Sequence, residues 1–119
     1  MKKDNIIVDK SKAFAIRIIK LYQYLCAEKK EFVLSKQLLR SGTSIGANVK
    51  EAIRGQSKAD FISKLNISLK EASETEYWLE LLQEAKYITN DEFESMKDDC
   101  IELIKLLTSI INSSKKNED

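Results

Sequence analysis

The chain has 119 residues, of which 43% are hydrophobic and 33% charged, and its formal net charge at pH 7 is +1. This length predicts one domain, residues 1–119, and the lack of proline together with only three glycines favours an all-α fold. No apolar run approaches the roughly 20 residues of a membrane-spanning helix, and Ile6–Val8 is too short for a signal-peptide core. We therefore expect a cytoplasmic protein with no membrane partner.

Charge is distributed unevenly along the chain. Residues 1–64 contain 14 Lys and Arg against 6 Asp and Glu, a net charge of +8, whereas residues 65–119 contain 6 against 13, a net charge of −7. Oppositely charged halves attract each other within one chain or between subunits. The alternative interpretation is a basic surface for a polyanion.

The residue types of most catalytic and metal sites are missing or isolated. The sequence has no histidine, which argues against a zinc or di-iron site and removes the usual general base for a nucleophile. Cys26 and Cys100 each lie in an apolar helical pattern, which is typical of reduced core residues. We predict no enzyme activity, no catalytic residue, no cofactor, no metal and no small-molecule substrate.

The first predicted helix spans about residues 10–29. Ile6–Val8 is predicted to be an apolar lead-in, with Asp9 or Ser11 as the helix cap. Two adjacent apolar stripes follow at helical spacing: Phe14, Ile18, Leu21 and Leu25, and Ala15, Ile19, Tyr22 and Cys26. A face this wide exceeds what contact with one neighbouring helix requires.

Three more helices are predicted, over about residues 35–54, 58–86 and 90–113. Gly55 is expected to end the second helix in a left-handed conformation, and capping boxes are expected at Ser57–Asp60 and Thr89–Glu92. The expected inward residues of the third helix are Phe61, Leu65, Leu69, Ala72, Leu79 and Leu82, and those of the fourth are Phe93, Met96, Cys100, Leu103, Leu107 and Ile110. Short connections between four helices predict an antiparallel up-down-up-down four-helix bundle.

The second helix contains the most distinctive stretch, residues 38–52. On a helical wheel, Leu38, Gly42, Ile45, Val49 and Ala52 share the core side. Gly42 and Gly46 each cost about 1 kcal/mol of helix stability relative to alanine, which favours close helix contact within the bundle or between subunits. A phosphate-binding loop is rejected, because no Gly-Lys-Ser/Thr and no strand accompany the glycines.

Polar residues at helical spacing flank that core side. We expect Ser41, Ser44, Asn48 and Glu51 to form a hydrogen-bonded network with Arg40 and a carboxylate of the third helix, Glu71 or Glu74. A catalytic Ser44–Glu51 pair is the alternative, but no base or oxyanion device accompanies it. The predicted helix or subunit contact motif is Arg40, Ser41, Gly42, Ser44, Gly46, Asn48 and Glu51.

The far side of the second helix is cationic. Lys36, Arg40, Lys50 and Arg54 share it, and Lys58, Lys64, Arg17 and Lys20 could extend it. Without interleaved aromatic residues the stripe is either a solvated face or a surface that binds nucleic acid through phosphates alone.

The run RSGTSIGANVKEA from Arg40 to Ala52, with Gln37–Leu39 before it and Ser57–Phe61 after it, resembles a bacterial four-helix-bundle family. Leu69–Leu79 resembles the third helix of that family, some of whose members are encoded by intervening sequences within 23S ribosomal RNA genes. The resemblance implies a left-handed bundle that assembles with itself into a ring, a pentamer in related proteins. It carries over no catalytic residue.

The accessory variability determinant proteins of diversity-generating retroelements look like relatives, and they bind nucleic acid and a reverse transcriptase through a basic surface. The matching positions here would be Lys36, Arg40, Lys50 and Arg54. Two functions are therefore expected: a non-enzymatic homo-oligomer and, as the alternative, an accessory factor that binds RNA or DNA.

Overall fold

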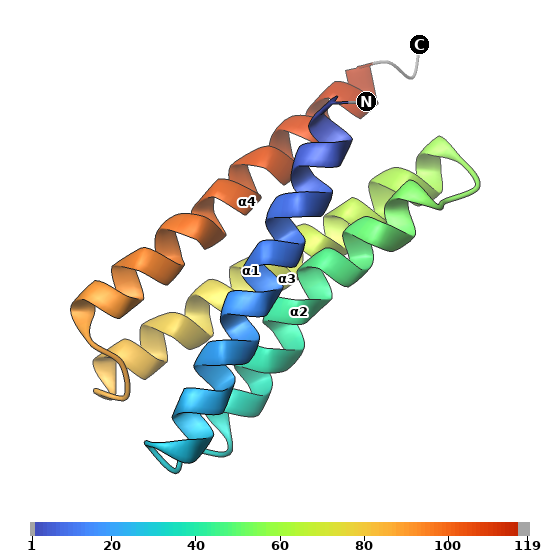
Figure 1. The fold of residues 1–119 in the computed structure, drawn as a ribbon. Helices are drawn as coiled ribbons and strands as arrows, with labels where there is room; N and C mark the ends of the chain where they lie inside the picture. Colours follow the sequence, from blue (N-terminus) through green and yellow to red (C-terminus); the bar gives the residue numbers. More distant parts are fainter. Residues whose placement is uncertain (1, 117–119) are drawn as a thin grey trace.

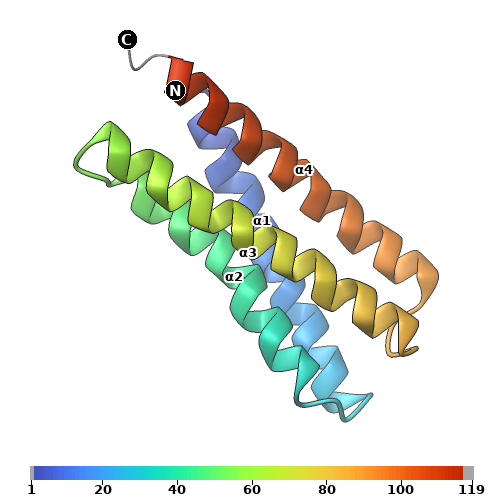
Figure 2. The same cartoon turned by 180° about the vertical axis from the view of Figure 1, so that it is seen from behind.

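The computed structural model describes residues 2–116, which form four α-helices and, within that range, no strand. The helices are α1 (Lys2–Ala27), α2 (Leu34–Ile53), α3 (Lys58–Glu84) and α4 (Asn90–Lys116). The predicted all-α class is confirmed. Consecutive helices run in opposite directions, so that the α1–α2 and α3–α4 turns lie at one end of the molecule and the α2–α3 turn at the other (Figures 1 and 2).

Each helix packs against two others, because α1 and α3 both contact α2 and α4. The bundle is elongated, with principal extents of 51 × 22 × 19 Å. α1 and α4 lie close together near the chain termini and move apart towards the end that carries two turns (Figure 1). The bundle is therefore more open between α1 and α4 than between its other neighbours.

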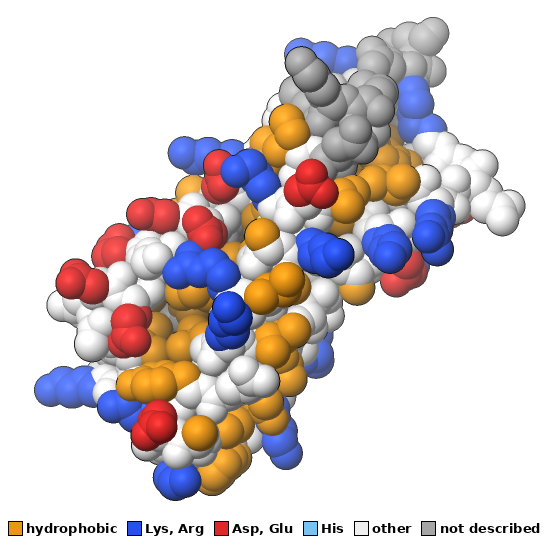
Figure 3. Space-filling view, viewed as in Figure 1, with side chains coloured by type: hydrophobic (Ala, Val, Ile, Leu, Met, Phe, Trp, Pro, Cys, Tyr) orange, Lys and Arg blue, Asp and Glu red, His pale blue; other side chains and the backbone are white. Residues whose placement is uncertain are grey.

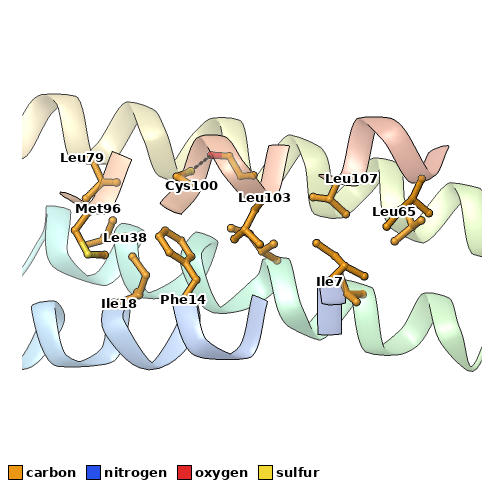
Figure 4. Close-up of a cluster of buried hydrophobic side chains, with 14 of the residues drawn as sticks. Ile7, Phe14, Ile18, Leu38, Leu65, Leu79, Met96, Cys100, Leu103 and Leu107 are labelled. Carbon is orange, nitrogen blue, oxygen red and sulfur yellow. Dashed lines mark hydrogen bonds between the residues drawn. The ribbon is translucent and has the colours of Figure 1, made fainter. Parts of the chain in front are cut away.

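Side chains from all four helices meet in one apolar core. Figure 4 shows Ile7, Phe14 and Ile18 of α1 facing Leu103 and Leu107 of α4 across the interior. The Cys100 thiol lies in the same core and donates a hydrogen bond of 3.2 Å to the backbone oxygen of Ala72 (Figure 4). Burial, together with nearby Glu76 and Asp99, raises the pKa of Cys100 to about 12, so this thiol stays protonated.

The prediction for the start of the first helix is wrong. α1 begins at Lys2, and Ile7 is buried rather than part of a lead-in. Ile7 and Ser11 continue the Phe14–Ile18 face towards the amino terminus at helical spacing. Ser11 does not cap the helix, because its hydroxyl donates to the backbone oxygen of Val8 within the helix at 3.2 Å.

Two of the predicted helix starts are confirmed in detail. The Ser57 hydroxyl accepts a hydrogen bond from the Asp60 N–H at 3.1 Å. Thr89 and Glu92 form a full capping box, in which each side chain accepts from the other's backbone N–H, at 3.1 and 2.7 Å.

The expected role of Gly55 is wrong, because no glycine among residues 2–116 has a positive φ. A Cβ at Gly55 would lie 3.0 Å from the backbone oxygen of Ala52, so glycine is favoured there by lack of space. Lys30 and Lys86 adopt left-handed conformations, with φ of 53° and 68°, after α1 and α3. Beyond Lys86, the N–H of Tyr87 bonds the Leu82 oxygen, which satisfies the end of α3.

The inward face of α3 also differs from the prediction. Ile62, Ser68 and Thr75 are buried, whereas Phe61 and Leu69 lie only at the edge of the core. The buried face therefore follows a seam that includes two hydroxyl side chains.

Candidate interaction surfaces

The glycines of α2 allow α1 to approach closely. A Cβ at Gly42 would lie 2.7 to 3.0 Å from three atoms of the Ile18 side chain, and one at Gly46 would lie 3.3 Å from the Ser11 hydroxyl. Side chains cannot occupy such gaps without displacing a neighbour. Both glycines therefore serve helix packing inside one chain, with α1 as the partner.

Buried hydroxyl groups connect α2 to α3. Thr75 Oγ1 lies 2.9 Å from Ser41 Oγ, and the Ser68 hydroxyl donates to the backbone oxygen of Ile45 at 2.8 Å. Ser41, Ser68 and Thr75 are each fully buried. Ser68 and Thr75 were missed from the sequence, although their seven-residue spacing beside Leu65, Ala72 and Leu79 is the signal that could have identified them.

Arg40 pairs with both of the carboxylates proposed for it. Its guanidinium donates to Glu71 at 2.8 Å and also to Glu74, which in turn accepts a hydrogen bond of 3.3 Å from the Trp78 indole N–H. The Arg40 side chain is 50% exposed and that of Glu71 only 17%. This ion-pair cluster joins α2 to α3 at the surface. Arg40, one of the four cations predicted to form the nucleic-acid face, is therefore already paired within the chain.

The remaining polar residues of the predicted motif do not form one network. The Ser44 hydroxyl and the Asn48 amide donate to carbonyls of their own helix, at 2.6 and 2.8 Å. Glu51 instead pairs with Lys64 of α3 at 3.0 Å. Ser44 and Glu51 thus bond separate partners, and the predicted connected network reduces to the Ser41–Thr75 contact and the Arg40 cluster.

The predicted cationic face of α2 is interrupted in its middle. Lys36, Lys50 and Arg54 are exposed, but Lys36 precedes Lys50 by 14 residues, which is about 21 Å along a helix. Thr43 and Ala47 lie between them, and Arg40 points to α3. Two separate cationic groups result, one at each end of α2.

A shallow groove runs between α1 and α2. It has a volume of about 350 Å³ and is lined by Val8, Ser11, Lys12, Ala15, Thr43, Gly46, Ala47 and Lys50. The second apolar stripe of α1 borders it but remains uncovered, because Ile19 is 39% exposed and neighbouring Ile16 is 47% exposed. Hydrophobic side chains consequently appear between the basic ones on the front of the molecule (Figure 3).

The turn between α1 and α2 is fixed by Glu31, which is buried although it carries a charge. Its carboxylate accepts the backbone N–H groups of Val33, Leu34 and Ser35, at 3.1, 3.0 and 2.7 Å. Burial acts to raise the pKa of Glu31, but these hydrogen bonds outweigh it and hold the pKa below the ordinary value of 4.5. The cap leaves Phe32 and Val33 exposed, by 52% and 72%.

A second groove opens where α1 and α4 diverge. Its volume is about 510 Å³, with Leu21, Tyr24 and Met96 as its apolar floor. Arg17 and Lys20 lie on the α1 rim, and Asp91, Glu92 and Ser95 on the α4 rim. Between this groove and the termini, two ion pairs connect the helices, Arg17–Asp99 at 2.5 Å and Lys10–Glu102 at 3.2 Å.

Two classes of site have no support within the described part of the chain. Residues 6–116, whose side chains the structure describes, contain no group of three or more His, Cys, Asp or Glu arranged to hold a metal ion. Over the same range, no helix is both long and apolar enough to cross a membrane. Cys26 and Cys100 are both unpaired; Cys100 is buried, and Cys26 is half-buried with its sulfur 3.7 Å from the Glu31 oxygen.

Comparison with known proteins gives a family and a close structural neighbour. A family model described as "23S rRNA-intervening sequence protein" matches residues 3–109. A crystal structure of a protein of unknown function from the S23 ribosomal protein family of Bacteroides thetaiotaomicron VPI-5482 is 63% identical. The similarity covers 92% of this chain and 98% of that one, with a TM-score of 0.92. A search of curated proteins found none that matches.

Proposed function

The chain belongs to the 23S rRNA-intervening sequence protein family, and from this premise we propose that it acts without enzymatic chemistry, as a cytoplasmic subunit of a homo-oligomer. Each subunit would be an up-down-up-down, left-handed four-helix bundle, and the assembly a ring, a pentamer by resemblance to related proteins. Substitutions can test two parts of this proposal: the surface that joins the subunits and the charge that orients them.

The observation that carries the proposal is the uncovered apolar stripe of α1. Ile16 and Ile19 are more than a third exposed, beside the half-buried Ala15 and Tyr22. A contiguous apolar face that no segment of its own chain covers is typical of a protein–protein contact. The small, exposed side chain of Ala47 in the adjoining groove would allow a helix of another subunit to approach.

Charge supports a head-to-tail arrangement. Residues 1–64, which include α1, α2 and the first turns of α3, carry a net charge of +8, and residues 65–119 carry −7. Acidic side chains gather over α4 on the left of Figure 3, and basic ones over α1 and α2 on the right. A ring built by rotation would bring the basic side of one subunit to the acidic side of the next.

The test is the mass of the protein in solution. The chain has a mass of 13.7 kDa, and light scattering after size-exclusion chromatography should give a multiple of it that falls as salt weakens the charged contacts. The double variant I16E/I19E should shift the protein to the monomer. I67E is the matched control, because Ile67 is 41% exposed on α3. A protein that stays monomeric at tens of micromolar contradicts the proposal.

A second candidate function is binding of RNA or DNA as an accessory factor. The observation that favours it is the pair of cations, Lys12 and Lys50, that line the α1–α2 groove from opposite helices, with exposed Arg54 one turn beyond Lys50. Binding would be through phosphates and would weaken steeply with salt.

The test of this second candidate is affinity for structured RNA. The affinity should fall in the variant K12E/K50E/R54E and stay unchanged in K97E, which alters a lysine of α4. Equal affinity in both variants would contradict this site.

A further inference from the structure

We propose that the Phe32–Val33 turn of one subunit docks into the α1–α4 groove of the next copy of the same chain. This inference rests on the proposed homo-oligomer and names one of its contacts. The docking turn is Lys29–Val33, and the receiving groove is the one with Leu21, Tyr24 and Met96 as its floor.

The first argument is that the turn is held in place while its apolar side chains point outward. The Glu31 carboxylate binds three successive backbone N–H groups, and the Glu31 N–H itself bonds the Leu25 oxygen at 3.0 Å. Ser35 adds a hydrogen bond from its hydroxyl to the Glu31 oxygen at 2.8 Å. These bonds hold the backbone of the turn in a conformation that leaves Phe32 and Val33 exposed. A preorganised apolar pair loses little entropy when it binds.

The second argument is that the groove has a suitable size and character. Its volume of about 510 Å³ falls within the range of roughly 300–1,000 Å³ typical of pockets that bury a ligand. The floor carries an aliphatic, an aromatic and a thioether side chain, and thioethers adapt to an inserted aromatic ring. Figure 3 shows apolar surface between the acidic side chains on the left and the basic side chains in the middle of the view.

Charge and position together identify the occupant. Lys29 and Lys30 lie in the docking turn, three and two residues before Phe32, and Asp91 and Glu92 line the α4 rim of the groove. All four side chains are exposed. The turn and the groove also lie towards the same end of the bundle, the turn joining α1 to α2 and the groove lying on the other side of α1, against α4 (Figure 1). A rotation about an axis along the bundle would therefore bring the turn of one copy to the groove of its neighbour, and repetition of that contact closes a ring.

The experiment is disulfide trapping between copies. In a C26A background, V33C/D91C should form covalent dimers and larger species on oxidation, seen on a non-reducing denaturing gel. The single variants V33C and D91C, and the double variant I67C/D91C, should remain monomeric on that gel. Ile67 provides the matched control because it is an exposed apolar residue on α3, away from the turn.

A second measurement removes the docking side chains. Because Phe32 and Val33 are exposed in the single chain, F32S/V33S should leave helix content unchanged and raise the dissociation constant of the oligomer at least tenfold. I67S/Y77S, which alters two exposed apolar residues of α3, should not. An oligomer that forms no V33C/D91C cross-link and tolerates F32S/V33S overturns this inference and leaves the proposed function standing. A wild-type protein that is monomeric by light scattering overturns both.

Discussion

The two sides of the bundle are built differently. On the α2 side, glycines bring α1 close to α2, and buried hydroxyls connect α2 to α3. These helices therefore cannot shift against each other without breaking close contacts. On the α1–α4 side, the helices diverge, two exposed ion pairs connect them, and a groove of about 510 Å³ stays open. The difference teaches that the close-packed contacts of the single chain and its open α1–α4 groove lie on opposite sides of the same bundle.

The largest expected effect is a disruption of the close-packed side at Gly42. Gly42→Val should destabilise the protein by about 2 kcal/mol, because a side chain there overlaps the buried Ile18. Chemical denaturation measures it. Gly46→Ala is the control: its Cβ would lie 3.3 Å from the Ser11 hydroxyl, and a gain of about 1 kcal/mol in helix propensity offsets that tight contact. Equal losses at both glycines would contradict this account.

The next effect concerns the cap that begins α2. Glu31→Gln should cost about 1.5 kcal/mol at pH 7, because a neutral amide replaces a carboxylate that accepts three N–H groups. The pKa of Glu31 is lowered by folding, so its contribution is complete above the ordinary value of 4.5 and is lost as the pH falls below it. Denaturation of both proteins from pH 7 to pH 3 should show curves that converge; a constant difference would refute the role of the charge.

A smaller effect is expected between α2 and α3. Thr75→Val keeps the shape of the side chain but removes the hydroxyl that meets Ser41, and it should cost about 1 kcal/mol. Thr108→Val is the control, since Thr108 is exposed on α4 and valine should change stability there by less than about 0.5 kcal/mol. Thermal denaturation of the two variants distinguishes these effects. Equal melting temperatures would mean that the buried hydroxyl of Thr75 contributes nothing to stability.

The smallest effect is expected on the α1–α4 side. Arg17→Ala removes contacts with Asp99 and Ser95, yet both members of the ion pair are about 40% exposed or more, so the loss should be less than about 1 kcal/mol. A double-mutant cycle with Asp99→Ala, measured on dilute protein, gives the coupling. A coupling energy above about 2 kcal/mol would show that this side is as firmly connected as the other.

The parts of the fold that were predictable are those with a local chemical signal. Thr89 and Glu92 predict the start of α4 from the sequence alone, because a capping box needs only four consecutive residues. The Arg40–Glu71/Glu74 pairing was also within reach, since opposite charges border the core side of one helix and the facing side of another.

What could not be predicted depends on contacts between distant segments. Ser68 and Thr75 look like exposed polar positions until Ile45 and Ser41 of α2 are placed opposite them. Glu31 looks like an ordinary turn residue, because its role as a cap depends on the left-handed backbone of the preceding Lys30. The beginning of α1 was missed for a similar reason: Ile7 extends the core face only if α4 continues far enough to cover it (Figure 4).

The order of the helix contacts along the chain also affects how quickly the protein folds. Three of the four helix pairs that touch are neighbours in sequence, and only α1 and α4 bring the two ends of the chain together. Local contacts of this kind require little loop closure, which places helical bundles among the fast folders, in the microsecond-to-millisecond range. The α1–α2 hairpin, with its cap at Glu31 and its glycine contact at Gly42, is complete within the first half of the polypeptide. It can therefore assemble on the ribosome before α4 has been synthesised.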